Sequence, residues 1–444
     1  MDALVLIPLI LATTAPPQTA TPPSPQPEAA QTGAPPTDAG QTNVPPDGVA
    51  PPKPAPAKIA LPQPAAASEA KLKLGGAIRG RYDLRFNDVG ADGQRRTSQH
   101  LSFDTLLLTA DYDSSVIFGS AQYRFYGGSF IYGRANGYDV YPGEVSFPMY
   151  AYVGAKLSAE DKVTVGLQPV PFDDRWWGSA FFNSLGFVYG MEEVYNLGIS
   201  ASHQGKKAGF DIGFFPGAAP NAFGISRDSA RFTVNLVRAD GYVPGGTQTA
   251  ERNMIVGRTK YQVPLSATAK LTLTGSGWIS SVRNFETGRD GYRHAAAFSA
   301  KVEDGRWHGK LLAARQIIDP RGPGPNDRVS VGDYDASYNI AARGTMLFGE
   351  LGRSIDTGKL PFELSLYGNY ARFLKSQGSF PDSERLTLGA FWTDKATHRI
   401  RIWSDLMIGR NDPYVGAGQF VSGAAQGGDN RVKTSLLILM GYYF

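Results

Sequence analysis

Basic side chains recur at alternate positions in the extended segment of residues 71–86. Arg79, Arg81 and Arg85 share one face of this segment with Asp83, whereas apolar residues occupy the other face. A guanidinium group binds phosphate or carboxylate through two parallel hydrogen bonds, so several of them on one face would concentrate anions. The same alternation places further basic side chains on the equivalent face of later segments. These are Arg124, Arg252, Arg258, Lys260 and Arg401.

A second interpretation of these arginines is structural. Asp83, Asp104 and Glu363 also fall in the predicted strands, and ion pairs with them would form a ladder along the wall instead of a path for anions. Residue types and spacing leave both interpretations open.

The sequence offers no catalytic or metal-binding constellation. It contains no Cys, which excludes disulfides and thiolate ligands, and its five His residues are widely spaced. No Gly-x-Ser-x-Gly segment precedes a helix. Basic residues are spread singly along the chain, which argues against nucleic-acid binding. We therefore predict a protein that is not an enzyme and that uses no cofactor or metal ion.

The segments that carry the basic side chains are predicted strands in which apolar and polar positions alternate. Seven tight polar turns, near 113–115, 159–162, 205–207, 264–267, 304–306, 356–359 and 395–398, alternate with eight longer connections. The longer connections lie near 87–98, 127–146, 173–192, 217–250, 284–291, 319–343, 375–382 and 411–431. This asymmetry is typical of a transmembrane antiparallel β-barrel, and it predicts about sixteen strands with both termini in the periplasm.

Two segments leave the strand count open. Residues 231–240 fall in a long connection although they have a strand pattern, and residues 330–355 are irregular, so eighteen strands are the alternative. A barrel of about sixteen strands is wide enough for an aqueous channel. The competing soluble architecture, a large β-sandwich or propeller, would have to protect its sheet edges.

Residues 432–444 are expected to close the barrel by pairing with residues 72–86. Met440, Tyr442 and Phe444 fall on the apolar face of this strand, where an aromatic girdle would meet the membrane interface. The segment resembles the closing strand of bacterial outer-membrane β-barrels. The resemblance implies that the terminal Phe is part of a signal read by the barrel-assembly machinery. We therefore expect this machinery and the lipid of a Gram-negative outer membrane as partners.

The first seventy residues have a different composition. Residues 1–15 contain a short apolar run and then small residues, as in a secretory signal peptide, although no Lys or Arg precedes the run. Residues 16–70 are rich in Pro and Ala and are predicted to be a disordered periplasmic segment. This segment would be either a tether toward peptidoglycan or an inert leader. The barrel is expected over residues 71–444.

Residues 163–199 contain the most specific internal motif. Gly166 and residues 170–172 (Val-Pro-Phe) are followed by the Ser/Phe/Asn-rich residues 179–183 and by Gly-Met-Glu-Glu-Val-Tyr-Asn-Leu-Gly at 190–198. This order resembles the phosphate-selective porin O/P type family, to which residues 229–232 and 251–253 are also similar. The resemblance implies homotrimers and an outer loop that folds into the barrel and narrows it.

By position, residues 173–192 are the candidate for this constriction loop. We expect its aromatic residues to pack on the inner wall and its charged residues to face the aperture; alternatively, the loop covers the barrel mouth. The residues assigned to it are Asp173, Asp174, Arg175, Trp176, Trp177, Phe181, Phe182, Tyr189, Glu192 and Glu193.

Together these features predict an outer-membrane porin that admits small hydrophilic solutes by passive diffusion and prefers phosphate or other small anions. One alternative is a carbohydrate or general-diffusion porin without anion selectivity. Alternatives of another class are an outer-membrane enzyme and a structural barrel that anchors the envelope.

Overall fold

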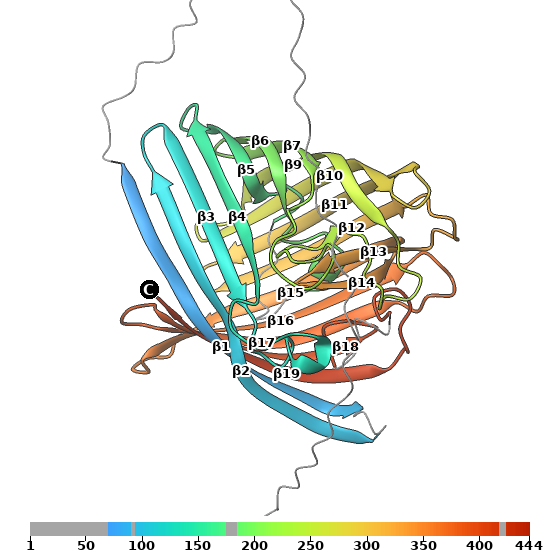
Figure 1. Cartoon of the computed structure of the whole chain (residues 1–444). Helices are drawn as coiled ribbons and strands as arrows, with labels where there is room; N and C mark the ends of the chain where they lie inside the picture. The colour runs from blue at the N-terminus through green and yellow to red at the C-terminus, as the bar shows by residue number, and fades with distance from the viewer. Residues whose placement is uncertain (1–69, 90–93, 175–183, 417–422) are drawn as a thin grey trace, which may run out of the picture. The chain divides into compact units, whose positions relative to one another are not determined.

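The computed structural model describes residues 70–89, 94–174, 184–416 and 423–444, and in this part of the chain sixteen antiparallel strands close into a barrel (Figure 1). The all-β barrel predicted from the sequence is confirmed. The wall strands are β1 (Lys71–Val89), β2 (Arg95–Asp113), β3 (Ile117–Tyr126), β4 (Val145–Lys156), β5 (Asp161–Pro169), β6 (Tyr195–Gln204), β7 (Ala208–Gly217), β9 (Thr249–Pro264), β10 (Ala269–Asn284), β11 (Asp290–Asp304), β12 (Trp307–Asp319), β15 (Arg343–Ile355), β16 (Phe362–Lys375), β17 (Ser383–Asp394), β18 (Ile400–Arg410) and β19 (Val432–Tyr443).

The barrel closes where β1 pairs with β19. Their register runs from Ala77 opposite Tyr443 to Phe86 opposite Thr434. The main chain of Phe444 extends the pair, because its N–H donates to the carbonyl of Gly76 (3.0 Å) and its carbonyl accepts from the N–H of Gly76 (2.9 Å). The predicted pairing of residues 432–444 with residues 72–86 is therefore present.

The alternation of apolar and polar residues separates an outer face from a lumen. Apolar side chains on the outer face of β1 are exposed, including Leu72 (64%) and Leu74 (70%), whereas Arg81 on the inner face is buried (4%). In water such exposed residues would be unfavourable, but on a barrel wall they form the surface that meets lipid.

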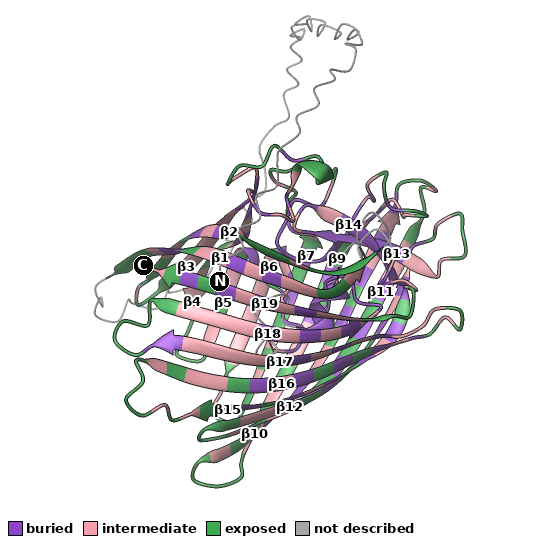
Figure 2. Cartoon of the chain, turned by 90° about the horizontal axis from the view of Figure 1, so that it is seen from below, coloured by how far each residue is buried: buried purple, intermediate pink, exposed green. Residues whose placement is uncertain are grey.

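A second, three-stranded sheet lies apart from the barrel wall. It consists of β8 (Asn235–Leu236), β13 (Arg328–Asp333) and β14 (Ala336–Ala341) in the order β14-β13-β8. All three strands belong to long connections, and much of β13 and β14 is buried (Figure 2). The alternative of eighteen wall strands is wrong, because the strand-like residues 231–240 and 330–341 supply this inner sheet.

Helix is confined to short turns in the described residues. They are the 3₁₀ turn η1 (Arg134–Asn136) and the α-helix α1 (Leu185–Val188). No helix in this part of the chain is long and apolar enough to span a membrane. The predicted signal peptide and Pro-rich segment lie outside the described residues.

Candidate functional site

The connection between β5 and β6 enters the lumen, and Asp173 fixes its first part to the inner face of β10, β11 and β12. The Asp173 carboxylate accepts hydrogen bonds from Lys310 Nζ of β12 (2.7 Å) and from Ser299 Oγ of β11 (2.6 Å). Its backbone N–H donates to Ser276 Oγ of β10 (2.9 Å). Asp173 and Lys310 are both almost fully buried, so they form a desolvated ion pair. Removal of either side chain would leave the other charge buried without compensation.

Asp174 makes a second set of contacts with β9. Its Oδ1 lies 2.5 Å from Lys260 Nζ and 3.1 Å from Arg258 Nη1, and Arg258 also pairs with Asp211 of β7 at 2.8 Å. Burial opposes ionisation of Asp174, but the positive charges of Lys260 and Arg258 outweigh burial and leave its pKa below the usual value. Arg258 and Lys260 face the lumen as predicted, and there they hold the loop with their charges paired.

The last part of the same connection is held by Arg293 of β11. This buried guanidinium pairs with Glu251 at 3.0 Å, lies 4.2 Å from the centre of the Trp278 ring, and donates to the carbonyl of Gly190 (2.6 Å). Two further donations go to Gln316 Oε1 of β12. Because these contacts fix the orientation of the guanidinium, Arg293 holds the backbone of the loop at Gly190 in one position.

Tyr189 lies on the wall on the other side of the lumen. Its ring stacks on Phe373 of β16 with centroids 3.7 Å apart, and its hydroxyl lies 2.9 Å from both Ser383 Oγ and the carbonyl of Ala425. The predicted packing of this aromatic residue on the inner wall is thus what the structure shows. The described parts of the loop are thus held on the inner face of the wall, near Asp173 by β9 to β12 and at Tyr189 by β16.

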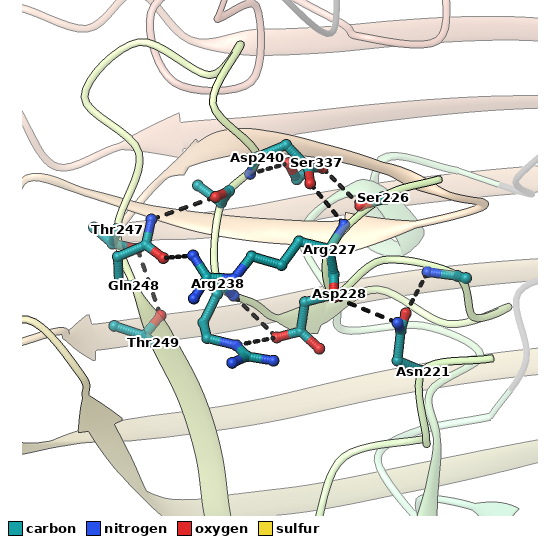
Figure 3. Close-up of polar contacts among 12 residues, drawn as sticks. Asn221, Ser226, Arg227, Asp228, Arg238, Asp240, Thr247, Gln248, Thr249 and Ser337 are labelled. Carbon is teal, nitrogen blue, oxygen red and sulfur yellow. Dashed lines mark hydrogen bonds and ion pairs between the residues drawn. The ribbon is translucent and has the colours of Figure 1, made fainter. Parts of the chain in front are cut away.

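The inner sheet packs beside this loop. Tyr338 of β14 donates its hydroxyl proton to the carbonyl of Val188 in α1 (3.0 Å), and both residues are buried. The connection that contains β8 is held by polar contacts within itself and with Ser337 of β14 (Figure 3). Asp240 accepts from Ser226 and Ser337, and Asp228 pairs with Arg238 at 3.3 Å. These contacts join the inner sheet, the connection that contains β8 and the end of the β5–β6 loop into one folded unit inside the barrel.

A cavity of about 820 Å³ lies between the inserted connections and the wall formed by β19, β1, β2 and β3. Four of the predicted basic residues, Arg79, Arg81, Arg85 and Arg124, line it. The buried apolar cluster, by contrast, draws most of its wall residues from β9 to β16. In the described part of the chain the inserted connections therefore pack mainly against β9 to β16, and the cavity lies between them and the arginine-bearing wall.

The arginines of this wall divide into two pairs. Arg79 lies 2.8 Å from Asp104, and Arg81 lies 2.7 Å from Asp83, as the structural-ladder interpretation predicted. Arg85 and Arg124 form no ion pair with the described residues. Glu363, the third carboxylate of the predicted ladder, is exposed on β16 and takes no part in it.

Arg252 does not face the lumen, and its predicted place in the pore lining is wrong. The strand β9 has an irregularity at Asn253, which adopts a positive φ of 52°, and its register with β10 shifts there. The extra residue reverses the alternation, so that Glu251 points inward and Arg252 outward, where it lies over the Phe285 ring. Arg401 lies over the Tyr443 ring at 4.5 Å and does not line the cavity.

The charged residues assigned to the constriction loop do not all face an aperture. Asp173 (4%) and Glu192 (2%) are buried, because each carboxylate is occupied by neighbouring donors, among them Lys310 and Ser184. Glu193 lines the cavity. Arg175, Trp176, Trp177, Phe181 and Phe182 lie outside the described residues.

Three anchoring residues were missed from the sequence: Lys310, Arg293 and Arg385. Arg385 of β17 pairs with Asp412 at 2.6 Å, with both side chains fully buried, and so fixes the connection after β18. Alternation could have placed all three side chains inside the barrel. It could not have identified their partners, which lie in distant connections.

No group of three or more His, Asp or Glu side chains in the described part of the chain is arranged to hold a metal ion.

No family model matches the sequence, and no curated protein sequence matches it. Among solved structures, the outer membrane channel DcaP of Acinetobacter baumannii is similar with a TM-score of 0.53 and 9% identity, over 84% of this chain and 97% of that one. Salmonella typhi OmpF in complex with daunomycin has a TM-score of 0.52 and 12% identity, over 84% and 97%. An anion-selective porin from Comamonas acidovorans has a TM-score of 0.49 and 14% identity, over 85% and 100%.

The likeness to DcaP and OmpF shows that the chain has the sixteen-stranded barrel fold of outer-membrane porins. The phosphate-selective porin O/P type is a narrower group than this fold, and the likeness in fold does not distinguish it from other porins.

Proposed function

We propose that the protein is an outer-membrane porin through which small hydrophilic solutes diffuse passively, with a preference for anions. The observation that carries the proposal is a closed barrel with an apolar outer face that encloses a cavity of about 820 Å³ along an arginine-bearing wall. The similar barrels of DcaP and OmpF, the first described as an outer membrane channel, support a channel function.

The anion preference rests on Arg85 and Arg124. Both line the cavity, and neither forms an ion pair with a described carboxylate. A fixed positive charge in a low-dielectric passage raises the local concentration of anions. Phosphate and other small anions are proposed solutes because a guanidinium donates to two of their oxygens at once.

Single-channel recording of the purified barrel in a planar bilayer tests both parts of this proposal. Ohmic pores should appear, and in a KCl gradient the reversal potential should show that Cl⁻ is more permeant than K⁺. The double variant Arg85→Gln/Arg124→Gln should lose most of this preference. Absence of pores rejects the channel function. Equal permeability identifies a general-diffusion porin, and a cation preference rejects the anion claim.

A further inference from the structure

The cavity has aromatic surfaces that hydrated inorganic anions would not bind. Aromatic rings from the inserted connections and from the end of β3 form much of its lining, beside the arginines. They include Tyr126, Phe130, Tyr132, Phe187, Phe232 and Tyr334. A volume of about 820 Å³ is in the range of small-molecule sites, and such sites combine apolar surfaces with a few fixed polar groups.

Arg124 is a fixed polar group in direct contact with these rings. Its guanidinium carbon lies 4.4 Å from the centre of the Phe232 ring, its Nε donates to Gln122 Oε1 (2.6 Å), and its Nη1 donates to Tyr126 Oη (3.2 Å). All of these partners are neutral. The guanidinium is therefore held in one orientation while its charge is not compensated by an ion pair with the described residues.

Phe232 belongs to a group of aromatic rings in edge and tilted contact. Its ring centre lies 5.4 Å from that of Tyr334, which in turn lies 5.3 Å from Tyr126. Tyr334 also contacts Phe187 at 6.3 Å. A flat apolar ring that enters the cavity next to Arg124 would meet these surfaces in the geometry that aromatic pairs prefer.

The acidic residues of the cavity do not compete strongly for Arg124. The Asp335 carboxylate accepts from the backbone N–H groups of Ile225 and Ser226 and from the Tyr138 hydroxyl. Asp333 is buried, and burial raises its pKa to about 8, so it is mostly neutral at pH 7. The remaining carboxylates of this lining are Asp83, Asp104, Glu193 and Asp240. Asp83 and Asp104 pair with Arg81 and Arg79, Asp240 accepts from Ser226 and Ser337, and none of the four forms an ion pair with Arg124 in the described part of the chain.

We propose that this cavity is a binding site for flat aromatic carboxylates, with Arg124 binding the carboxylate and Phe232 and Tyr334 packing against the ring. The inference rests on the proposed channel function, because the solute must reach the cavity from solution. A small hydrated anion gains only the contact with Arg124, whereas an aromatic carboxylate gains that contact and also buries its ring. The site therefore favours the second class of solute over phosphate.

The test uses benzoate, acetate and inorganic phosphate as separate probes of single-channel current. Benzoate should reduce the current at a concentration roughly tenfold lower than acetate or phosphate, which is the ratio given by one extra aromatic contact. Arg124→Gln should raise the half-blocking concentration of benzoate roughly tenfold, and Arg124→Lys should raise it less, because the charge is kept and the planar fork is lost. Phe232→Leu should weaken block by benzoate without changing the effect of acetate.

Arg315→Gln is the matched control, because Arg315 is an exposed arginine on β12 that does not line the cavity. It should leave block by benzoate unchanged. Equal half-blocking concentrations for benzoate and acetate, or an Arg124→Gln variant that folds and is blocked like the wild type, would overturn the proposal. If no pore forms, equilibrium dialysis of labelled benzoate against the detergent-solubilised barrel still tests the site: binding lost in Arg124→Gln supports it, and absence of binding to the wild type overturns it.

Discussion

Asp333 is a buried carboxyl group with one strong partner. The Tyr414 hydroxyl donates to its Oδ2 (2.6 Å), and its Oδ1 has no hydrogen bond from the described residues. Burial raises its pKa to about 8, and the bond from Tyr414 offsets this only in part. Because the folded state holds this proton more tightly than the unfolded state, ionisation destabilises the inner sheet as pH rises from the ordinary Asp value of 3.8 to about 8.

We therefore expect Asp333→Asn to remove this pH dependence. In the wild type, protection of the β13 amides against hydrogen exchange should fall between acidic pH and pH above about 8. In Asp333→Asn the protection should be nearly constant once the intrinsic exchange rate is corrected. Asp290→Asn, at an exposed position of β11, should behave as the wild type. If Asp333→Asn keeps the full pH dependence, the titrating group is not Asp333.

At the scale of elements, the loop between β5 and β6 depends on the Asp173–Lys310 pair. Removal of one partner leaves a buried charge uncompensated, at a cost of about 3–5 kcal/mol. We expect Asp173→Ala to release the first part of the loop, and therefore to increase current noise and the mean conductance of single channels. Asp290→Asn is again a suitable control, because its ion pair with Arg283 is exposed. Unchanged current in Asp173→Ala would show that Asp174 and Arg293 suffice to hold the loop.

The sequence predicted the wall far better than the lumen, for a reason that Leu236 and Asn253 illustrate. Each wall strand has a local alternating pattern and pairs with the next wall strand along the chain, so turns and strands could be counted. Leu236 of β8 instead pairs with Val331 of β13, which belongs to another connection, and no local pattern encodes that partner. Asn253 shows the other limit. One irregular residue reverses a strand's inner face, and residue types give no warning of it.

For the whole molecule, closure depends on the β1–β19 seam. Deletion of Phe444 removes its two main-chain hydrogen bonds with Gly76, each with a net contribution of about 0.5–1.5 kcal/mol, at the end of that seam. We expect a lower fraction of folded barrel, measured by heat-modifiable migration in gels. The barrels that do fold should keep wild-type conductance, because Phe444 does not line the cavity. Phe285→Ala, at another exposed aromatic, should fold with normal yield.

The seam also determines the order of assembly. Every other wall pair joins two wall strands that follow one another along the chain. The seam instead joins the first wall strand to the last. Its chain-entropy cost is the largest, so it should form last and slowly. Until then β1 and β19 are two unpaired edges with apolar faces, which is the state in which strands of different molecules pair and aggregate. The lifetime of the open sheet, more than the strength of any contact in the finished barrel, should therefore limit the yield of folding.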